Sequence, residues 1–410
     1  MRRSLSRASE FSAGKVGIFV GSLNRLLDRI DAGLDEGSIE GQLPDGCRRM
    51  LGGRCAGPTA EMNIRSWRAL RRIAWSGSIG LYEGWEKGEW DSPDPVQIFA
   101  LFTLNRKALG NSARASAPMR LVARLLNRFR RNSRSGARRN IEFHYDLGND
   151  FYAAWLDKSM TYSSAIFAEP LDEGEPLELA QLRKIDLLLD RLDLKDGDHL
   201  LEVGCGWGSL AKRAMARADI RYHGITLSAG QKAYADVQIA ADGRGAVTLT
   251  DYRDVEGAFD AIASVEMVEA VGQEYWSAYL TSIARNLKPG GRAVIQFISI
   301  ADDIFDSYSR SVDFIQRYVF PGGMLLSESR FRTLAQSNGL VWHDQHDFGH
   351  HYAETLKRWR KRFDAVANEG LLPSGFDEKF VRLWRYYLMY CEGGFRGGAI
   401  NVAQVTLVKS

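Results

Sequence analysis

At 410 residues the chain is longer than one hydrophobic core usually spans, so its length predicts two domains. Its 54 Lys and Arg nearly balance 51 Asp and Glu, which excludes a protein that binds nucleic acid through its overall charge. Four cysteines without C-x-x-C spacing argue against a zinc site or a disulfide framework, and the basic start lacks the apolar run of a signal peptide. We therefore expect a cytoplasmic protein.

Residues 1–111 predict a small accessory α+β domain without catalytic spacing. Leucine and isoleucine recur at helical spacing between Phe11 and Leu34, and a second helix is expected from Val96 to Leu109. A strand followed by a helix is expected between Ile64 and Trp75. We interpret three tryptophans of this region as core residues: Trp75, Trp85 and Trp90.

The charge and apolar pattern of residues 112–140 predicts a basic amphipathic linker. Nine arginines and no acid fall between Ser112 and Arg139, and apolar residues recur among them at helical spacing. Such a helix suits an anionic membrane surface, with its apolar face in the acyl boundary and its cations among the headgroups. A linker helix packed on its own domain explains the pattern equally well.

Residues 141–410 predict an α/β domain with a parallel, doubly wound sheet, because expected strands and helices alternate. Its ligand crevice should lie at the carboxyl ends of the strands. The polar and aromatic stretch from Ile141 to Tyr152 is either a lid over that crevice or a helix covering the sheet edge. The expected strands are His199–Gly204, Tyr222–Leu227, Val247–Asp251, Phe259–Val265, Arg292–Ile298, Val341–His346 and Val402–Val408. The expected helices include Leu210–Ala216, Ser228–Ala241, Glu274–Leu287 and Ser327–Ser337, and a helical pair is expected from Ala353 to Cys391.

A glycine turn follows the first of these strands, at Gly204, Gly206 and Gly208. Glycine allows the backbone to approach a ligand closely, so the turn predicts a nucleoside site. The second strand ends in Thr226 and Leu227 with Gln231 one helical turn later, and no phosphate-binding cation is near. These groups favour the neutral ribose and amino-acid tail of S-adenosylmethionine over the pyrophosphate of NAD. Tyr252 and Arg253 are expected to flank the adenine.

The chain resembles the cyclopropane-fatty-acyl-phospholipid synthase family of methyltransferases from about Ile141 to its C-terminus and, more weakly, in its N-terminal domain. The matching stretches are His144–Asp150, Met160–Ser163, Glu202–Gly208, Gly224–Ser228 with Gln231, Glu266–Gly272 and Tyr318–Gly323. The resemblance implies a Rossmann-like class I methyltransferase domain, S-adenosylmethionine as cofactor, and an unsaturated acyl chain of a phospholipid as substrate. The cofactor-binding residues that we predict are Tyr162, Ser163, Glu202, Gly204, Gly206, Thr226, Leu227, Gln231, Tyr252 and Arg253.

Methylation of an alkene leaves a carbocation, which a base must then deprotonate. Loss of the proton from the new methyl group closes a cyclopropane, whereas loss from a neighbouring carbon leaves a methylated or methylene chain. Aromatic faces stabilise such a cation, and the candidates are Tyr145, Phe151, Tyr162, Tyr318 and Phe320. The segment from Asp302 to Met324, with the helical pair, either walls an acyl tunnel or packs as ordinary core.

The resemblance implies bicarbonate as that base, held by a Cys, a Glu, a His and a Tyr. Glu269 and Tyr352 match, but Ser164 stands at the Cys position and Gln296 at the His position. Gln296 keeps a hydrogen-bond donor but cannot carry a proton, so Glu269 or a nearby histidine becomes an alternative base. The predicted catalytic residues are Glu269, Tyr352, Ser164, Gln296 and Tyr318. The histidines at 343, 346, 350 and 351 lack an acid pair, so we predict no metal site.

We therefore predict a methyltransferase that is peripherally associated with the inner face of the membrane and forms a possible homodimer. Its product is a cyclopropane or a methyl-branched chain, including a furan precursor. Methylation of a soluble small molecule, and a catalytically silent lipid-binding protein, are the alternatives.

Overall fold

A computed structural model describes residues 21, 23–110, 133, 136, 147–239 and 242–410. The chain divides into two compact units, Met1–Val122 and Ala123–Ser410. Nearly all of the predicted basic linker lies outside the described residues, as do His144, Tyr145 and Asp146. Among the helices that are described, none is long and apolar enough to cross a membrane. All four cysteines are free.

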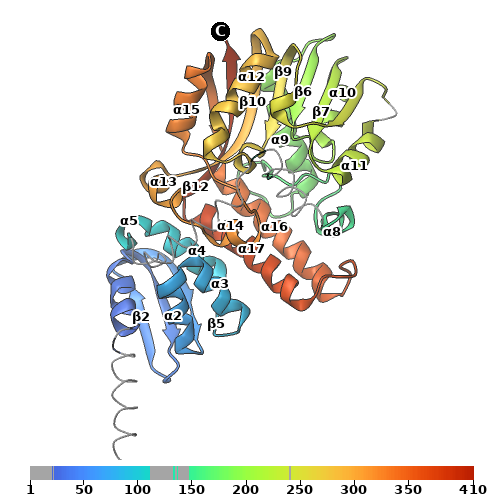
Figure 1. Ribbon diagram of the computed structural model, residues 1–410. Helices are drawn as coiled ribbons and strands as arrows, with labels where there is room; N and C mark the ends of the chain where they lie inside the picture. Colours follow the sequence, from blue (N-terminus) through green and yellow to red (C-terminus); the bar gives the residue numbers. More distant parts are fainter. Residues whose placement is uncertain (1–20, 22, 111–132, 134–135, 137–146, 240–241) are drawn as a thin grey trace, which may run out of the picture. The chain divides into compact units, whose positions relative to one another are not determined.

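The first unit combines a small sheet with short helices (Figure 1). The sheet has the order β2-β1-β3, with β1 antiparallel to β2 and parallel to β3. Residues 23–32 are helical, as expected. The further elements are β1 (Glu36–Gln42), β2 (Arg48–Gly52), β3 (Cys55–Glu61), β4 (Asn63–Ile64), α2 (Trp67–Ser76), α3 (Ser78–Glu86), β5 (Trp90–Asp91), α4 (Pro95–Leu104) and α5 (Arg106–Leu109).

Two predictions for this unit need correction. The helix expected from Val96 to Leu109 is interrupted at Asn105, whose side chain exchanges hydrogen bonds with the backbone of Glu36 at 2.9 and 2.8 Å. Trp90 is a core residue with 1% exposure, and its indole N–H donates to the Leu81 carbonyl. Trp75 is 54% exposed, so its assignment to the core was wrong.

The second unit is built on a seven-stranded sheet of order β11-β12-β10-β9-β6-β7-β8. The strands from β10 to β8 in this order are parallel, as expected, but β12 is antiparallel to both of its neighbours, β10 and β11. The strands are β6 (His199–Val203), β7 (Arg221–Thr226), β8 (Gly245–Leu249), β9 (Phe259–Val265), β10 (Leu287–Ile300), β11 (Leu340–Asp347) and β12 (Ile400–Lys409).

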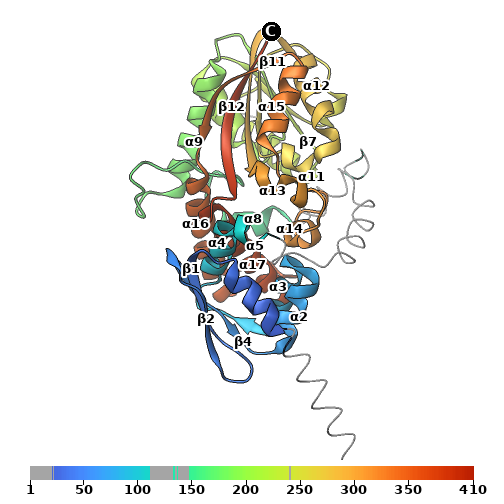
Figure 2. The same cartoon turned by 90° about the vertical axis from the view of Figure 1, so that its left-hand side faces the viewer.

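Helices cover both faces of this sheet (Figures 1 and 2). Trp276, Tyr279 and Phe331 of α12 and α15 pack on one face, and Leu188 and Leu210 of α9 and α10 pack on the other. The helices are α8 (Asn149–Trp155), α9 (Leu177–Leu192), α10 (Ser209–Arg217), α11 (Ala229–Ile239), α12 (Trp276–Asn286), α13 (Asp302–Tyr308), α14 (Phe314–Tyr318), α15 (Glu328–Ser337), α16 (Gly349–Asn368) and α17 (Glu378–Arg396), with 3-10 turns η2 (Tyr252–Asp254), η3 (Val268–Ala270) and η4 (Gln273–Tyr275). The predicted helical pair is α16 and α17.

The strand order reverses between β6 and β9. From β6 the chain adds β7 and β8 on one side, and it then returns to add β9 and β10 on the other. Ligands of open α/β sheets bind at such a reversal, beyond the carboxyl ends of the strands. Gly204 follows β6 and Glu266 follows β9, so these two residues lie at the edge where a ligand is expected.

Candidate active site

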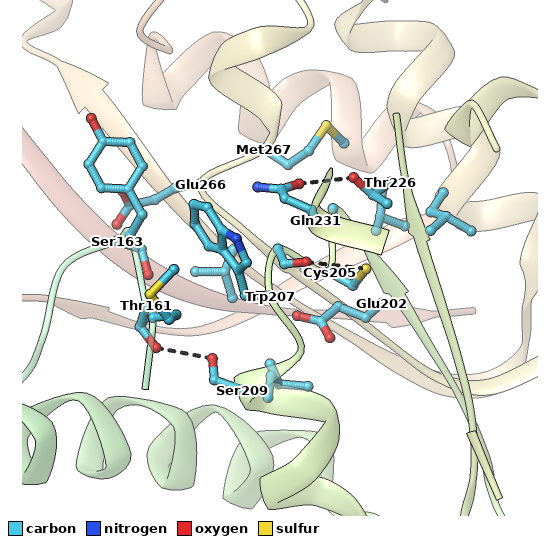
Figure 3. Close-up of a pocket in the computed structure, with 18 of the residues that line it drawn as sticks. Thr161, Ser163, Glu202, Cys205, Trp207, Ser209, Thr226, Gln231, Glu266 and Met267 are labelled. Carbon is cyan, nitrogen blue, oxygen red and sulfur yellow. Dashed lines mark hydrogen bonds between the residues drawn. The ribbon is translucent and has the colours of Figure 1, made fainter. Parts of the chain in front are cut away.

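A cavity lies beyond the carboxyl ends of β6, β7, β8 and β9 (Figure 3). The empty space bounded by its residues is about 1020 Å³, open solvent included. The predicted position of the ligand crevice is thus confirmed. The predicted cofactor residues that line the cavity are Tyr162, Ser163, Glu202, Gly204, Gly206, Thr226, Leu227, Gln231 and Tyr252.

The glycine turn uses left-handed backbone at each of its glycines. The φ angles are +84° at Gly204, +52° at Gly206 and +88° at Gly208. Residues other than glycine rarely adopt these angles. A Cβ atom at Gly204 would lie 2.7 Å from Cγ of Met267. A Cβ atom at Gly206 would have nothing within 4 Å. Gly204 therefore permits close packing of two strand ends, and Gly206 leaves bare backbone beside open space.

The second strand supplies an oriented amide. Oγ1 of Thr226 donates to Oε1 of Gln231 at 2.9 Å. Figure 3 shows the amide nitrogen of Gln231 on the opposite side, directed into the cavity. Gln231 is 5% exposed, so this amide is held in place for a ligand with hydrogen-bond acceptors.

The described part of the predicted lid touches the glycine turn. Oδ1 of Asn149, at the start of α8, accepts a hydrogen bond from the indole nitrogen of Trp207 at 2.9 Å. The side-chain amide of Asn149 also donates to the Gly230 carbonyl at 3.1 Å. These bonds join α8 to the glycine turn and to the first turn of α11.

Two buried ionisable side chains, one lysine and one glutamate, border the cavity. Lys184 of α9 is 1% exposed, and its Nζ donates to Oγ of Ser163 at 2.6 Å. Burial lowers the pKa of Lys184 to about 8, against the opposing attraction of Glu266 and Glu202. Burial raises the pKa of Glu202 to about 8, and its carboxyl accepts from Tyr222 Oη at 2.5 Å. A bound cation beside Glu202 would favour its ionised form.

The carboxyl group of Glu266 collects hydrogen bonds from three separate elements. Its Oε1 accepts from the backbone N–H of Ser164 at 2.9 Å and from Nε2 of Gln296 at 2.7 Å. Its Oε2 accepts from Tyr352 Oη at 2.7 Å. Three predicted catalytic residues therefore meet at a glutamate that the sequence marked only as part of a matching stretch. Glu266 lines the cavity and has a left-handed φ of +49°.

Burial and neighbouring charges act in opposite directions on Glu266. Burial raises the pKa of its carboxyl above the ordinary value, while the hydrogen bonds from Tyr352, Ser164 and Gln296 and the charge of Lys184 lower it. Tyr352 stays a donor because burial raises its pKa well above 10.

Glu269, the predicted base, lies one 3-10 turn further along the chain, and its side chain is outside the cavity lining. Its Oε1 accepts from the backbone N–H of Ile298. Its Oε2 is buried with no hydrogen-bond partner among the described residues. Burial, aided by the charge of Glu266, raises the pKa of Glu269 to about 8. Burial thus favours the protonated form of the Glu269 carboxyl.

Replacing Glu269 with Gln is expected to flatten the dependence of stability on pH. The native pKa of about 8 lies above the ordinary value of 4.5, so the stabilisation from the protonated acid is complete below 4.5 and is lost as pH rises through 8. Without ligand, the melting temperature of Glu269→Gln minus that of the native protein should increase by a few degrees from pH 5 to pH 8.5. Glu369→Gln, at an exposed position, is the control; a difference for Glu269→Gln that is constant with pH would refute the expectation.

Six of the predicted catalytic and cofactor-binding residues are outside the cavity lining: Glu269, Ser164, Gln296 and Tyr352, described above, and also Arg253 and Tyr318. Arg253 is paired with Asp251 at 2.6 Å and lies over the ring of Tyr252, 5.3 Å from its centroid. Tyr318 packs against Phe314 at the end of α14. Neither residue is among those that border the cavity.

A histidine cluster does meet an acid in the fold. Glu169, His350 and His351 bring possible ligand atoms within 4.8 Å of one another, away from the cavity. Nε2 of His350 already lies 2.6 Å from a carboxylate oxygen of Glu169. The absence of a metal site stays a prediction.

Glu266 and Lys184 were not predicted as functional residues from the sequence. An acid directly after the last residue of a parallel strand was the available signal for Glu266. Lys184 falls in an ordinary amphipathic helix pattern, and only the fold reveals that its side chain points inward.

An open α/β sheet with a glycine turn after one central strand, and with hydroxyl and amide groups after the next, defines a class I S-adenosylmethionine-dependent methyltransferase. The chain belongs to the mycolic acid cyclopropane synthetase family, whose model matches residues 132–405. The family and the cofactor predicted from sequence are confirmed.

Three similar proteins illustrate the match. The tuberculostearic acid methyltransferase of Mycobacterium tuberculosis is 41% identical over 354 residues, which are 83% of this chain and 81% of that protein. The cyclopropane-fatty-acyl-phospholipid synthase of Escherichia coli is 35% identical over 354 residues, or 84% and 87% of the two chains. A crystal structure of a mycolic acid cyclopropane synthase complexed with SAH and CTAB has a TM-score of 0.62 at 31% identity, covering 66% of this chain and 98% of that one.

The cavity fits S-adenosylmethionine. The bare backbone at Gly206 and the inward amide of Gln231 suit a nucleoside with an amino-acid tail, and Glu202 offers an acid to a cationic ligand. When bound, the cofactor supplies an electrophilic methyl group. Bicarbonate does not fit these residues, because the donors that would hold it, on Ser164, Gln296 and Tyr352, already donate hydrogen bonds to Glu266.

Proposed function

We propose that the chain transfers the methyl group of S-adenosylmethionine to a double-bond carbon of an unsaturated acyl chain in a membrane phospholipid. The observation that carries the proposal is the extent of the similarity to two lipid methyltransferases, which covers 81% and 87% of their lengths. A match of that extent includes much more than a cofactor-binding motif. The family model, which matches residues 132–405, also includes Gln296 and Tyr352.

The chemistry requires a dry cavity with an aromatic wall. An isolated alkene is a weak nucleophile, so the residues must hold it in line with the methyl donor and exclude water. Tyr162 lines the cavity, and its ring packs against Tyr152, Trp155 and Trp359 at centroid distances of 5.2 to 5.7 Å. We assign the stabilisation of the developing carbocation to the face of Tyr162.

The product and the membrane contact complete the proposal. A cyclopropane forms when the new methyl group loses the proton, and a methyl-branched alkene forms when a neighbouring chain carbon loses it. A methylene chain forms when a hydride first shifts from the methylated carbon to the cationic carbon and the methyl group then loses the proton. The arginine-rich segment between Ser112 and Arg139 is proposed to hold the enzyme at an anionic membrane surface as a peripheral protein.

The direct test supplies purified protein with methyl-labelled S-adenosylmethionine and vesicles of dioleoylphosphatidylglycerol. We expect labelled acyl chains that have gained one carbon, and no label in vesicles of the saturated distearoyl lipid. High-field proton NMR signals would identify a cyclopropane, and vinyl or methyl signals would identify a branched product. Absence of label from every unsaturated lipid would refute the proposed function.

The membrane contact is tested separately. Co-sedimentation with the anionic vesicles should be strong at low salt and weaken as salt rises, because exposed charges are screened. Binding that is indifferent to salt and to the anionic headgroup would contradict the role of the arginine-rich segment.

A further inference from the structure

We propose that Glu266 is the general base of the reaction, a carboxylate built into the chain that accepts the proton lost from the methylated acyl chain. This inference rests on the proposed function and deepens it. It follows from the position of the carboxylate, from the way it is held, and from the comparison with Glu269.

The position of Glu266 places its carboxylate where a base is needed. The residue lines the same cavity as Gly204, Gly206 and Tyr162. Figure 3 shows Glu266 near Trp207, across the cavity from Thr226. Among the described acids, Glu202 and Glu266 are the ones that border this cavity, and Glu202 is held by Tyr222 beneath the glycine turn.

The hydrogen bonds of Glu266 fix the carboxylate and leave accepting capacity on one oxygen. Oε1 receives two hydrogen bonds, whereas Oε2 receives one, from Tyr352, among the described residues. A carboxylate oxygen has two lone pairs, so Oε2 is the atom that we assign to accept the proton. The donors come from the loop before α9, from β10 and from α16, so the geometry is determined by the fold as a whole.

A further contact orients the amide that holds Oε1. Nε2 of Gln404 in β12 donates to Oε1 of Gln296 at 3.1 Å. With its carbonyl oxygen thus occupied, Gln296 presents its NH₂ group to Glu266. Gln296 and Gln404 are both fully buried. They are positioning residues, because they act on the substrate only through Glu266.

The backbone of Glu266 is the second sign of function. A non-glycine residue at φ +49° is in strained backbone, and such residues cluster at active sites. Glutamate at a position that suits glycine is explained if its carboxylate is required there. Glu269 has neither feature: it is outside the cavity lining, and it is not among the non-glycine residues with a left-handed φ.

The proton transfer balances without a further reactant. Methyl transfer to one alkene carbon leaves a cation on the other. Oε2 of Glu266 then takes a proton, and the electron pair of the broken C–H bond forms the ring C–C bond or a new C=C bond. The protonated Glu266 returns its proton to water when the product leaves. Bicarbonate is not required, which separates this route from one that uses an external base.

The first experiment measures methyl transfer in buffer freed of carbon dioxide, with the dioleoylphosphatidylglycerol vesicles described above. The native protein should keep its full rate without bicarbonate. Glu266→Gln, which keeps the size of the side chain but cannot accept the proton, should lose about 10²- to 10⁴-fold in turnover. Its affinity for S-adenosylmethionine, measured by calorimetry, should stay within about threefold, which corresponds to less than 1 kcal/mol.

Glu266→Gly provides the second readout. Glycine suits the left-handed backbone and leaves the three donors facing an empty place of carboxylate size. We expect bicarbonate to restore turnover at least about tenfold in this variant and to leave the native protein and the exposed control Glu369→Gln unchanged. With ¹³C-labelled bicarbonate, NMR should detect binding to Glu266→Gly and none to the native protein.

Each contrary result has its own meaning. A native enzyme that needs bicarbonate, a Glu266→Gln variant that keeps its turnover, or a folded Glu266→Gly variant without rescue would overturn the role of Glu266. A native enzyme that methylates no unsaturated lipid, with or without bicarbonate, would instead refute the proposed function itself.

Discussion

Replacement of Gly204 by Ala is expected to weaken the binding of S-adenosylmethionine at least about tenfold and to destabilise the fold. The new Cβ would lie 2.7 Å from Cγ and 3.1 Å from Cβ of Met267, so one of the two strand ends must move. Forced overpacking costs about 1–3 kcal/mol, and left-handed backbone adds about 1–3 kcal/mol for a residue with a side chain. Calorimetric titration and thermal unfolding measure the two effects.

The matched control is Gly290→Ala, in the exposed first part of β10. Gly290 has a similar φ of +75°, but a Cβ atom there would have nothing within 4 Å. This variant should show the backbone cost alone and bind the cofactor normally. If both variants bind S-adenosylmethionine equally well, the close packing at Gly204 has no role in shaping the cofactor site.

Replacement of Lys184 by Met is expected to move the acid limb of the pH–rate profile to higher pH. Lys184 lowers the pKa of Glu266, and burial raises it, so loss of the cation leaves less Glu266 ionised at a given pH. The rate on the acid limb therefore falls relative to that of the native enzyme. The other groups facing Glu266 are Tyr352, Gln296 and Glu269, and the variant keeps all three.

The native and Lys184→Met profiles should converge in alkaline buffer. The pKa of Lys184 is itself lowered to about 8, so the native enzyme also loses the charge as pH rises past that value. Lys195→Met, at a lysine with 69% side-chain exposure, is the control. An acid limb unchanged in Lys184→Met would mean that Glu266 does not control the rate.

Local patterns in the sequence predicted most of the second unit. The expected bounds of β9, Phe259 to Val265, are those of the structure, because an apolar run ends there at charged residues. The reversal of β12 could not be predicted, because a buried strand has the same apolar pattern in either direction. The sheet of β1 to β3 was missed, because residues 36–61 are rich in glycine and arginine and lack regular alternation.

The candidate site was predictable only where its residues lie close together in sequence. The glycine turn, Thr226 and Gln231 fall between the end of β6 and the first turn of α11, so spacing alone brought them together. The partners of Glu266 are 102, 30 and 86 residues away from it, and no local pattern reports such a meeting. Glu269 was chosen because of a family resemblance, whereas the hydrogen bonds centre on the acid three residues earlier.

The antiparallel last strand has a consequence for how this enzyme can diverge. Gln404 of β12 is buried in the sheet and is not hydrogen-bonded to Glu266. It nevertheless determines that the nitrogen of the Gln296 amide, and not its oxygen, meets Glu266. A substitution at Gln404 can therefore rotate the Gln296 amide and shift the Glu266 carboxylate. The carbon that loses its proton to Glu266 can then change while every residue that contacts cofactor or lipid stays the same. Close homologues that make different lipids could thus have identical cavity walls, and the residue that distinguishes them would be hidden in the final strand.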